Sequence, residues 1–393
     1  MADKGRLWSA EYIMVLFSML CNGMAGMMTV PLVAKYAIQT GADLTVASAV
    51  AGLMSLVALI ICPFAGALCD RCSRKRILIF ANFGYGCSLA LHSVCTVLPA
   101  LVLIRLITGV FFSVCTVANV AYSSSYIPNQ RMGEGLGYVG LTTIVAQALG
   151  PSLGLELQEK GGFGLTFAVA GCFAVVCMIS VILMPYQSST VSEVKRKKTC
   201  LKDLYAVQFT VFMLMAVLLS SAGGLISTYL AIIADIRKIA GITVFFTLYS
   251  VFAVAFRPFT GRILDNRGIF HILIPAFLCT GMCMFFIGIS ETLLFITIAS
   301  FFGALGQGSG LPSIQAHCVK SVSKEMAGVA TSTVMIGQNV GNAIAPVIGS
   351  FFIKPFGYGA AFCGFGLAAA AAGISLVLIQ MNRNRKNGKS VSE

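Results

Sequence analysis

The chain has 393 residues, of which 58% are hydrophobic and 10% are charged, and its mean hydropathy is +0.90. Soluble domains carry about 25% charged residues, so this composition excludes a soluble globular protein. The net charge of +13 comes from Lys and Arg in short segments between apolar runs. Because no basic helix face is interleaved with aromatic residues, we exclude nucleic-acid binding. Positive-inside loops and anionic lipid headgroups account for the charge.

Cysteine and histidine are placed as structural rather than catalytic residues. The 14 Cys lie mostly in apolar segments, where Cys behaves as a small hydrophobe, so a disulfide framework is not expected. Cys69 and Cys72 have CxxC spacing, but no second CxxC or His pair accompanies them, and we predict no metal site. The three His lie on separate segments: His92, His271 and His317. Without a catalytic cluster, an enzyme and a bound cofactor are not expected.

Twelve segments are long and apolar enough to cross a bilayer, which takes about 20 residues per helix. The first apolar run, after Lys4 and Arg6, is too long for a signal peptide and is expected to stay as an anchor. The predicted spans are residues 11–37, 44–69, 76–97, 100–126, 135–157, 163–185, 206–234, 242–264, 270–289, 292–317, 325–352 and 358–381. Helices satisfy their own backbone groups in lipid. The predicted fold class is an all-α integral membrane protein with twelve transmembrane helices.

Lys and Arg are distributed unevenly across the predicted spans. With the N-terminus inside, 20 of the 27 fall on inner segments and 5 on outer ones, while Arg105 and Arg257 lie within spans. The positive-inside rule therefore predicts that both termini are cytoplasmic.

An internal repeat relates the two halves at an offset of 195 residues. The shift carries Pro63, Phe64, Gly66 and Asp70 onto identical residue types, namely Pro258, Phe259, Gly261 and Asp265. It also carries Pro151 onto Pro346 and Gly154 onto Gly349. Two separate segments that agree on one offset indicate a parallel repeat of two pseudo-symmetric six-helix bundles.

The repeat and the longest polar break define the predicted domains. Residues 1–187 form an N-terminal bundle and residues 206–382 a C-terminal bundle. Between them, residues 188–205 form a cytoplasmic linker that contains a run of four basic residues, and residues 383–393 form a basic cytoplasmic tail. A basic linker of this kind is expected to lie against anionic headgroups.

The segment after the second span carries charges at a distinctive spacing, Gly-xxx-Asp-Arg-xx-Arg-Lys: Gly66, Asp70, Arg71, Arg74 and Lys75. It resembles the loop signature between the second and third helices of the major facilitator superfamily, with Ser73 where Gly is usual. Gly261 and Asp265 are its counterparts in the second half, where Asn266 replaces Arg. The resemblance implies a gating loop. Asp70 would interact with the positive N-terminal end of the helix beginning near Lys324 and latch the outward-open state.

Small residues mark the fifth predicted helix and its counterpart, the eleventh: Gly137, Ala146, Gly150, Pro151, Gly154, Gly341, Pro346 and Gly349. The pattern resembles the one characteristic of exporters among drug:proton antiporters of that superfamily. Small residues let helix backbones approach closely, and Pro can kink a helix. We expect a close, bendable contact between the two halves, which would suit a rocking movement; export is implied by the resemblance alone.

Two residues are candidates for coupling to protons. Arg105, followed by Gly109, matches a further family motif whose Arg is thought to act in proton coupling, although snorkelling to the surface is an alternative. The 14 acidic residues fall almost entirely in loops or at span ends, and Glu156 is the best carboxylate candidate. Many drug antiporters have an acid in the first helix, where this chain has Asn22. A neutral or anionic substrate therefore fits better than a lipophilic cation.

Polar residues within spans are costly unless they are paired or face a cavity. On this basis we predict a set of candidates for the substrate cavity, with helix–helix hydrogen bonding as the alternative for the amides. The set is Asn22, Asn119, Gln147, Tyr229, Tyr249, Arg257, Gln307, Gln338, Asn339 and Asn342.

The sequence thus predicts a secondary transporter that moves a small organic molecule by alternating access, as proton-coupled efflux. The alternative is an importer or facilitator of a neutral or anionic metabolite without an intramembrane carboxylate relay. The expected partners are the lipid bilayer, a small-molecule substrate and protons, with no nucleic acid, and the expected oligomeric state is a monomer. The expected location is the cytoplasmic membrane of a bacterial cell.

Overall fold

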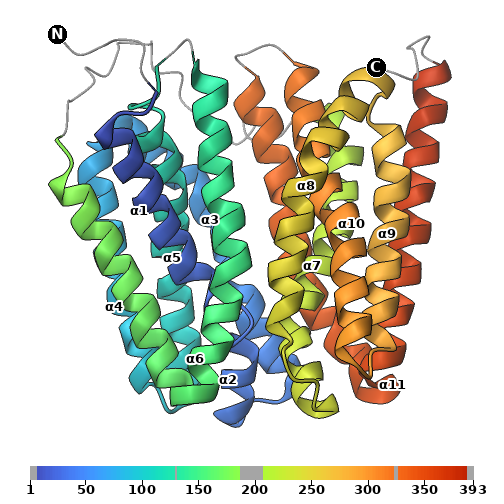
Figure 1. Cartoon of the computed structure of the whole chain (residues 1–393), viewed down its shortest axis with the longest axis horizontal. Coiled ribbons are helices and arrows are strands. Elements are labelled where there is room, and N and C mark those ends of the chain that lie inside the picture. Colours follow the sequence, from blue (N-terminus) through green and yellow to red (C-terminus); the bar gives the residue numbers. More distant parts are fainter. Residues whose placement is uncertain (1–6, 129–130, 186–206, 323–325, 387–393) are drawn as a thin grey trace. The chain divides into compact units, whose positions relative to one another are not determined.

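The computed structural model describes residues 7–128, 131–185, 207–322 and 326–386, where its regular secondary structure is helical (Figure 1). The predicted linker 188–205 and residues 387–393 of the predicted tail lie outside them. The helices are α1 (Ala10–Met27), α2 (Val33–Gln39), α3 (Leu44–Arg71), α4 (Arg74–Val94), α5 (Leu98–Ser123), α6 (Met132–Leu183), α7 (Thr210–Arg237), α8 (Thr243–Arg267), α9 (Phe270–Gly288), α10 (Leu293–Lys320) and α11 (Ala327–Lys386), with a 3₁₀ turn at Val207–Phe209.

Ten of the described helices are long and apolar enough to cross a membrane, and two of these, α6 and α11, contain two crossings each. Both bend at a glycine with a positive φ, Gly162 at 75° and Gly357 at 77°. In α11 the chain reverses at this bend, since Tyr229 contacts both the Pro346 carbonyl oxygen and the ring of Phe362. In α6 it reverses likewise, since Thr166 Oγ1 lies 3.4 Å from the Gly154 carbonyl oxygen. Twelve residues of straight helix would separate these positions by about 18 Å. The twelve predicted crossings are therefore present in the described ranges.

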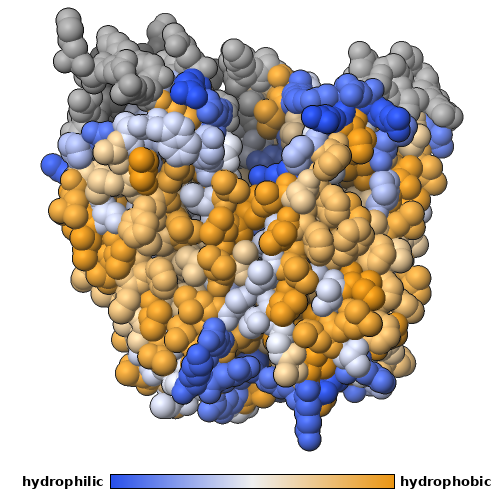
Figure 2. All heavy atoms as spheres, viewed as in Figure 1, coloured by the Kyte–Doolittle hydropathy of each residue, from blue (hydrophilic) through white to orange (hydrophobic). Residues whose placement is uncertain are grey.

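The chain divides into two compact units. Unit 1 consists of Met1–Ala42 and Leu56–Lys198, and unit 2 consists of Asp43–Ser55 and Thr199–Glu393. The first part of α3 thus belongs to unit 2, and the rest of that helix belongs to unit 1. On the visible face, hydrophobic side chains cover the middle of the helices and hydrophilic side chains gather at the helix ends (Figure 2). This pattern suits helices whose middles lie in hydrocarbon.

The prediction of one continuous first span over residues 11–37 was wrong, because two helices separated by a turn occupy this range. The helix α1 ends at Met27, a turn follows, and the short helix α2 begins at Val33. Pro31 lies in the turn, where it lacks a backbone N–H and disfavours helical geometry in the residue before it. Thr29 Oγ1 donates to the Gly26 carbonyl oxygen over 2.9 Å and closes the helix end.

Within unit 1, α6 packs backbone-to-backbone against the end of α1. A methyl group added at Gly154 would overlap the Met28 carbonyl oxygen, and one added at Gly150 would lie 2.6 Å from Met27 Cβ. In unit 2, α11 packs on α7 in the same way, because a methyl group at Gly341 would lie 2.5 Å from the Val217 carbonyl oxygen. The small-residue contact expected between the two halves is thus a contact inside each unit, which serves packing rather than sliding.

A second pair of glycine contacts repeats at the same offset and was missed by the sequence analysis. In unit 1, a methyl group at Gly171 would lie 3.3 Å from the Gly86 carbonyl oxygen, where α6 meets α4. In unit 2, Gly366 and Gly281 bring α11 and α9 together, with the corresponding distance at 2.9 Å. Gly86 and Gly281, like Gly171 and Gly366, differ by 195 positions. The repeat therefore extends from sequence to the closest contacts of each unit.

The C-terminal ends of α4 and α9 receive equivalent caps from different residues. Tyr36 on α2 donates to the carbonyl oxygens of His92 and Cys95. In unit 2, Arg237 Nη1 donates to the carbonyl oxygens of Ile287 and Ser290 over 3.0 and 2.6 Å. These acceptors are again 195 positions apart. The two units therefore use different side chains to bind equivalent carbonyl groups, which are unpaired at the end of every helix.

Substitution of Gly154 by Ala tests the contact between α6 and α1. We expect Gly154→Ala to lower the thermal unfolding temperature of the purified protein, because the added methyl group would overlap the Met28 carbonyl oxygen. Gly137→Ala on the same helix is the matched control, since no atom lies within 4 Å of its position. In a helix Ala is favoured over Gly by about 1 kcal/mol, so the control should unfold at an equal or higher temperature. Equal behaviour of both variants would contradict this packing.

Candidate functional site

The predicted gating loop begins at the end of α3. Gly66 faces open space, with no atom within 4 Å of its Cβ position, and Asp70 and Arg71 continue the helix, their side chains lying outside the described ones. Arg74 Nη1 donates to the Ala121 carbonyl oxygen over 2.8 Å. Lys75 Nζ donates to the carbonyl oxygens of Ile182 and Met184 over 2.9 and 2.7 Å.

These two basic residues therefore hold helix ends together. Arg74 binds the C-terminal end of α5 and Lys75 binds that of α6, where unpaired carbonyls carry partial negative charge. The basic residues expected from the motif thus act in part as helix caps within unit 1.

The second-half counterpart forms an ion pair. Asp265 at the end of α8 pairs with Lys320 at the end of α10, and Gly261 faces open space as Gly66 does. Lys320 was not among the predicted site residues. Its position in the last turn of a span, close after His317, is the signal that could have indicated it.

A row of polar contacts joins the first part of α3 to α7 and α11 within unit 2; we call it the α3 ladder. Lys354 Nζ lies 2.6 Å from Asp43 Oδ2, and Ser350 Oγ donates to Thr45 Oγ1 over 3.1 Å. Further along, the Tyr229 hydroxyl lies 2.6 Å from Ser48 Oγ.

The same hydroxyl of Tyr229 donates to the Pro346 carbonyl oxygen over 2.6 Å, so it ties α7 to α11 as well as to α3. Beyond the ladder, a methyl group at Gly52 would lie 2.5 Å from the Ala343 carbonyl oxygen. Only Tyr229 and Pro346 of this set were predicted. Helical spacing was the available signal, because Thr45, Ser48 and Gly52 share one face of α3.

Several predicted cavity residues are buried or half-buried within their own unit. The Asn22 amide donates to Asn82 Oδ1 over 3.1 Å, so these amides join α1 to α4. Asn119 is buried on α5, and its Oδ1 has no partner among the described residues. Gln307 Nε2 donates to the Leu219 carbonyl oxygen over 3.1 Å and thereby links α10 to α7.

Other candidates lie at the surface of a unit. Gln147 and Arg257 are exposed on α6 and α8, while Tyr249 is half-buried and stacks on Phe245 with ring centroids 6.0 Å apart. The amides of α11 are half-buried: Gln338, Asn339 and Asn342. Glu156 is exposed and pairs with Lys160 over 2.6 Å.

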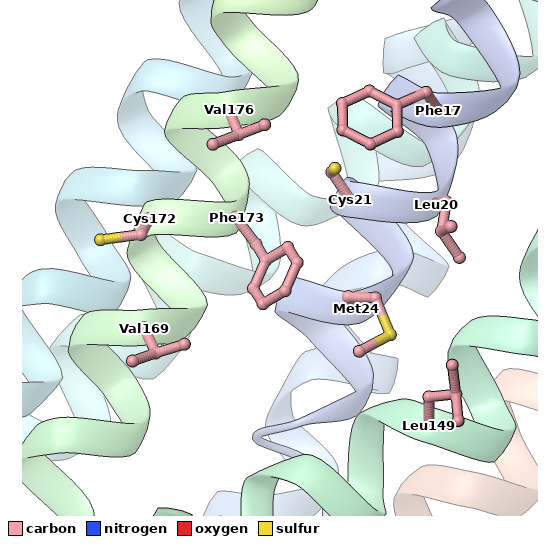
Figure 3. A pocket seen from close by; sticks show the side chains of 9 residues that line it. All are labelled: Phe17, Leu20, Cys21, Met24, Leu149, Val169, Cys172, Phe173 and Val176. Atoms are coloured by element: carbon pink, nitrogen blue, oxygen red, sulfur yellow. The ribbon is translucent and has the colours of Figure 1, made fainter. Parts of the chain in front are cut away.

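An apolar hollow of about 320 Å³ lies on unit 1 between α1 and the two parts of α6 (Figure 3). Its lining consists of Phe17, Leu20, Cys21, Met24, Leu149, Val169, Cys172, Phe173 and Val176. With only carbon and sulfur side chains at the wall, the hollow suits hydrocarbon and offers nothing to orient a polar substrate.

Comparison with known proteins decides the family. The sequence pattern of the Major Facilitator Superfamily matches residues 15–336 and, in an overlapping second match, residues 246–393. The chain belongs to the Major Facilitator Superfamily. Its fold is accordingly the major facilitator fold of two six-helix bundles, and members of this family are transporters rather than enzymes. The family predicted from the loop signature is confirmed.

Individual relatives are distant. The chain is similar to the multidrug resistance protein MdtG of Escherichia coli, with 22% identity over 370 residues that cover 90% of each chain. Among solved structures, a mutant of the nucleoside transporter NupG has a TM-score of 0.79 at 12% identity, covering 93% of this chain and 99% of that one. A POT family transporter in complex with a thioalcohol-conjugated peptide has a TM-score of 0.78 at 12% identity, with 95% and 96% covered.

Removal of the Tyr229 hydroxyl tests the α3 ladder. Tyr229→Phe leaves the Pro346 carbonyl and Ser48 without this partner, and an unmet buried hydrogen bond costs about 1–3 kcal/mol. We expect a lower unfolding temperature in detergent. Tyr249→Phe is the matched control, because its hydroxyl makes no hydrogen bond among the described residues. If the two variants unfold at the same temperature, the ladder contributes nothing to the stability of unit 2.

The ion pair of Asp43 predicts a specific pH dependence. The hydrogen bond from Lys354 holds the pKa of the Asp43 carboxyl below its usual value. A lowered carboxyl pKa stabilises the fold above the unfolded value of about 3.9, and the contribution disappears as the pH falls through the lowered pKa. The difference in unfolding temperature between the native protein and Asp43→Asn should stay constant from pH 8 to 5 and shrink only below about pH 4. A change between pH 6 and 8 would contradict this assignment.

Proposed function

We propose that the chain is a secondary transporter that exports a small organic molecule across the cytoplasmic membrane by alternating access, coupled to protons. Membership of a transporter family and similarity to a multidrug resistance protein support efflux. The unbalanced distribution of Lys and Arg supports an orientation with both termini in the cytoplasm. We place the protein in a bacterial membrane, as a monomer, because its bundles come as a complete pair within one chain.

The observation that carries the substrate class is the charge inside the spans. Arg105 is buried, with 1% of its surface exposed, whereas the described carboxylates are exposed or half-buried. A buried positive charge disfavours a cationic substrate in the same bundle. The function therefore concerns neutral or anionic molecules, and Arg105 is the first candidate for coupling.

Gating rests on the two motif segments. We propose that Asp70 latches unit 1 to the N-terminal end of α11 in one state of the cycle, as the loop signature implies. Its counterpart Asp265 pairs with Lys320 inside unit 2. The α3 ladder would hold the outer end of α3 in the opposite state of the cycle, since it fixes that end with hydrogen bonds while the rest of the helix belongs to unit 1.

One alternative is favoured by a specific observation. Glu156, the best carboxylate candidate for carrying protons, is exposed and paired with Lys160. A facilitator or importer of a neutral or anionic metabolite would need no carboxylate relay. The two functions differ in whether a proton gradient drives accumulation.

Transport into proteoliposomes with an imposed pH gradient separates them. For molecules whose outer face points into the lumen, an acidic lumen should drive accumulation of substrate as protons leave. A panel of cationic, neutral and anionic compounds is tested, and we expect neutral or anionic compounds to accumulate. Uptake that ignores the gradient would overturn proton coupling and support the facilitator.

The Glu156→Gln variant in the same assay tests the carboxylate. Because Glu156 is exposed and paired with Lys160, we expect gradient-driven accumulation to persist at the native level. Loss of the gradient dependence, with counterflow of substrate retained, would instead identify Glu156 as the proton carrier.

A further inference from the structure

Arg105 is a buried cation with unused hydrogen-bonding capacity. It lies on α5 about 10 Å from the start of that helix. Its side chain is 1% exposed, and neither Nε nor Nη1 has a hydrogen-bond partner among the described residues. Guanidinium does not lose its proton in proteins, so the positive charge is permanent. A permanent charge buried without an acceptor is strongly destabilising.

The Tyr85 ring on α4 packs on Phe112, with ring centroids 5.7 Å apart, and Phe112 shares the face of α5 that carries Arg105, seven residues earlier. Two side chains of α4, Tyr85 and His92, thus lie on the side of α4 that interacts electrostatically with Arg105. They are seven residues apart and so share one face of the helix, and both have 0% of their surface exposed. The Tyr85 hydroxyl has no partner among the described residues. It can therefore act as a donor toward the same space as Arg105.

His92 offers an acceptor atom on the same face of α4. Its Nδ1 lies 2.8 Å from the Ser88 carbonyl oxygen, which can only accept, so Nδ1 carries the proton. In the neutral ring Nε2 is then a lone pair, and it has no partner among the described residues. The donor atoms without a partner among the described residues are thus Nε and Nη1 of Arg105 and the Tyr85 hydroxyl.

The described carboxylates of unit 1 do not neutralise Arg105. Glu134 pairs with Arg131, Glu156 pairs with Lys160, and Glu11 and Glu159 stand in the first turn of α1 and near the bend of α6. The surroundings of the Tyr85 hydroxyl are also crowded. A methyl group at Gly26 would lie 3.4 Å from the Tyr85 hydroxyl oxygen and 2.9 Å from the ring of Phe112.

We propose that Arg105 and Tyr85 form a buried site for a compact monoanion, either a free halide such as chloride or the carboxylate group of a small organic acid. A buried cation and a buried hydroxyl, each with donors that lack a partner among the described residues, suit a single negatively charged acceptor. Phe112 packs on Tyr85 and Phe167 packs on His92, so the surroundings are apolar. Bulky or dianionic groups are excluded, because apolar surroundings offer no hydrogen bonds to offset the cost of removing them from water. The site does not depend on the direction of transport or on proton coupling.

The test measures thermal unfolding of the full-length protein in detergent. Chloride or acetate is titrated, as the potassium salt, into a sulfate buffer at constant ionic strength. We expect a saturable rise in unfolding temperature for the native protein. A rise with chloride alone assigns the site to a free halide, and a rise with acetate as well assigns it to carboxylates.

Three variants make the result specific. Arg105→Gln should lose the saturable rise, yet fold with equal or greater stability in sulfate buffer, because it removes a buried unpaired charge. Tyr85→Phe should raise the half-saturating concentration about tenfold or more, since one hydrogen bond to an anion is lost. Arg262→Gln, which removes an exposed arginine of α8 in unit 2, should respond as the native protein does.

The proposal is overturned if chloride and acetate produce no saturable rise in the native protein. It is equally overturned if Arg105→Gln shows the same rise, because the effect then comes from the solvent or from another site. If Arg105→Gln does not fold, the affinity of Tyr85→Phe decides, and an unchanged half-saturating concentration rejects the site.

Discussion

Close backbone contact at small residues is the constraint on which each unit depends. Lipid tails are as apolar as Leu, so burial of hydrophobic side chains gives little drive for helices to associate in a membrane. Van der Waals contact must replace it, and that requires backbones to approach. Gly154 against Met28 in unit 1 and Gly341 against Val217 in unit 2 provide such contacts, as do the pairs Gly86–Gly171 and Gly281–Gly366. These contacts join α6 to α1 and α4 in unit 1, and α11 to α7 and α9 in unit 2.

Much of the fold could be predicted because membranes impose simple length and polarity rules. Spans of about 20 apolar residues follow from local composition, and the bends at Gly162 and Gly357 fall in the gaps between predicted spans. The repeat follows from identical residue types at one offset. The break after Met27 was missed because residues 28–37 are as apolar as a span, and only Pro31 signals the turn. The partner of the small residues was also mistaken, since a glycine pattern identifies a close contact without saying which helix approaches.

The candidate site was predictable in residue type but less so in surroundings. Arg105, Asn22 and Tyr229 stood out as polar residues in apolar segments, and all three are buried. Burial alone could not reveal that Asn22 is satisfied by Asn82 while two nitrogens of Arg105 remain without a partner. Such pairing depends on side chains that are far apart in sequence. The helix caps formed by Tyr36 and Arg237 show the same limit. They occupy equivalent positions but differ in residue type, because the repeat preserves the carbonyls and not the side chains that bind them.

The most direct test of the packing account compares valine substitutions at positions related by the repeat. Gly171→Val and Gly366→Val add side chains at close backbone contacts, whereas Gly66→Val and Gly261→Val add them where no atom lies within 4 Å. Thermal unfolding of the four purified variants is the measurement. The account predicts that the first pair is destabilised and that the second pair unfolds close to the native temperature. Equal unfolding temperatures for the two pairs would contradict the claim that small-residue contacts hold each unit together.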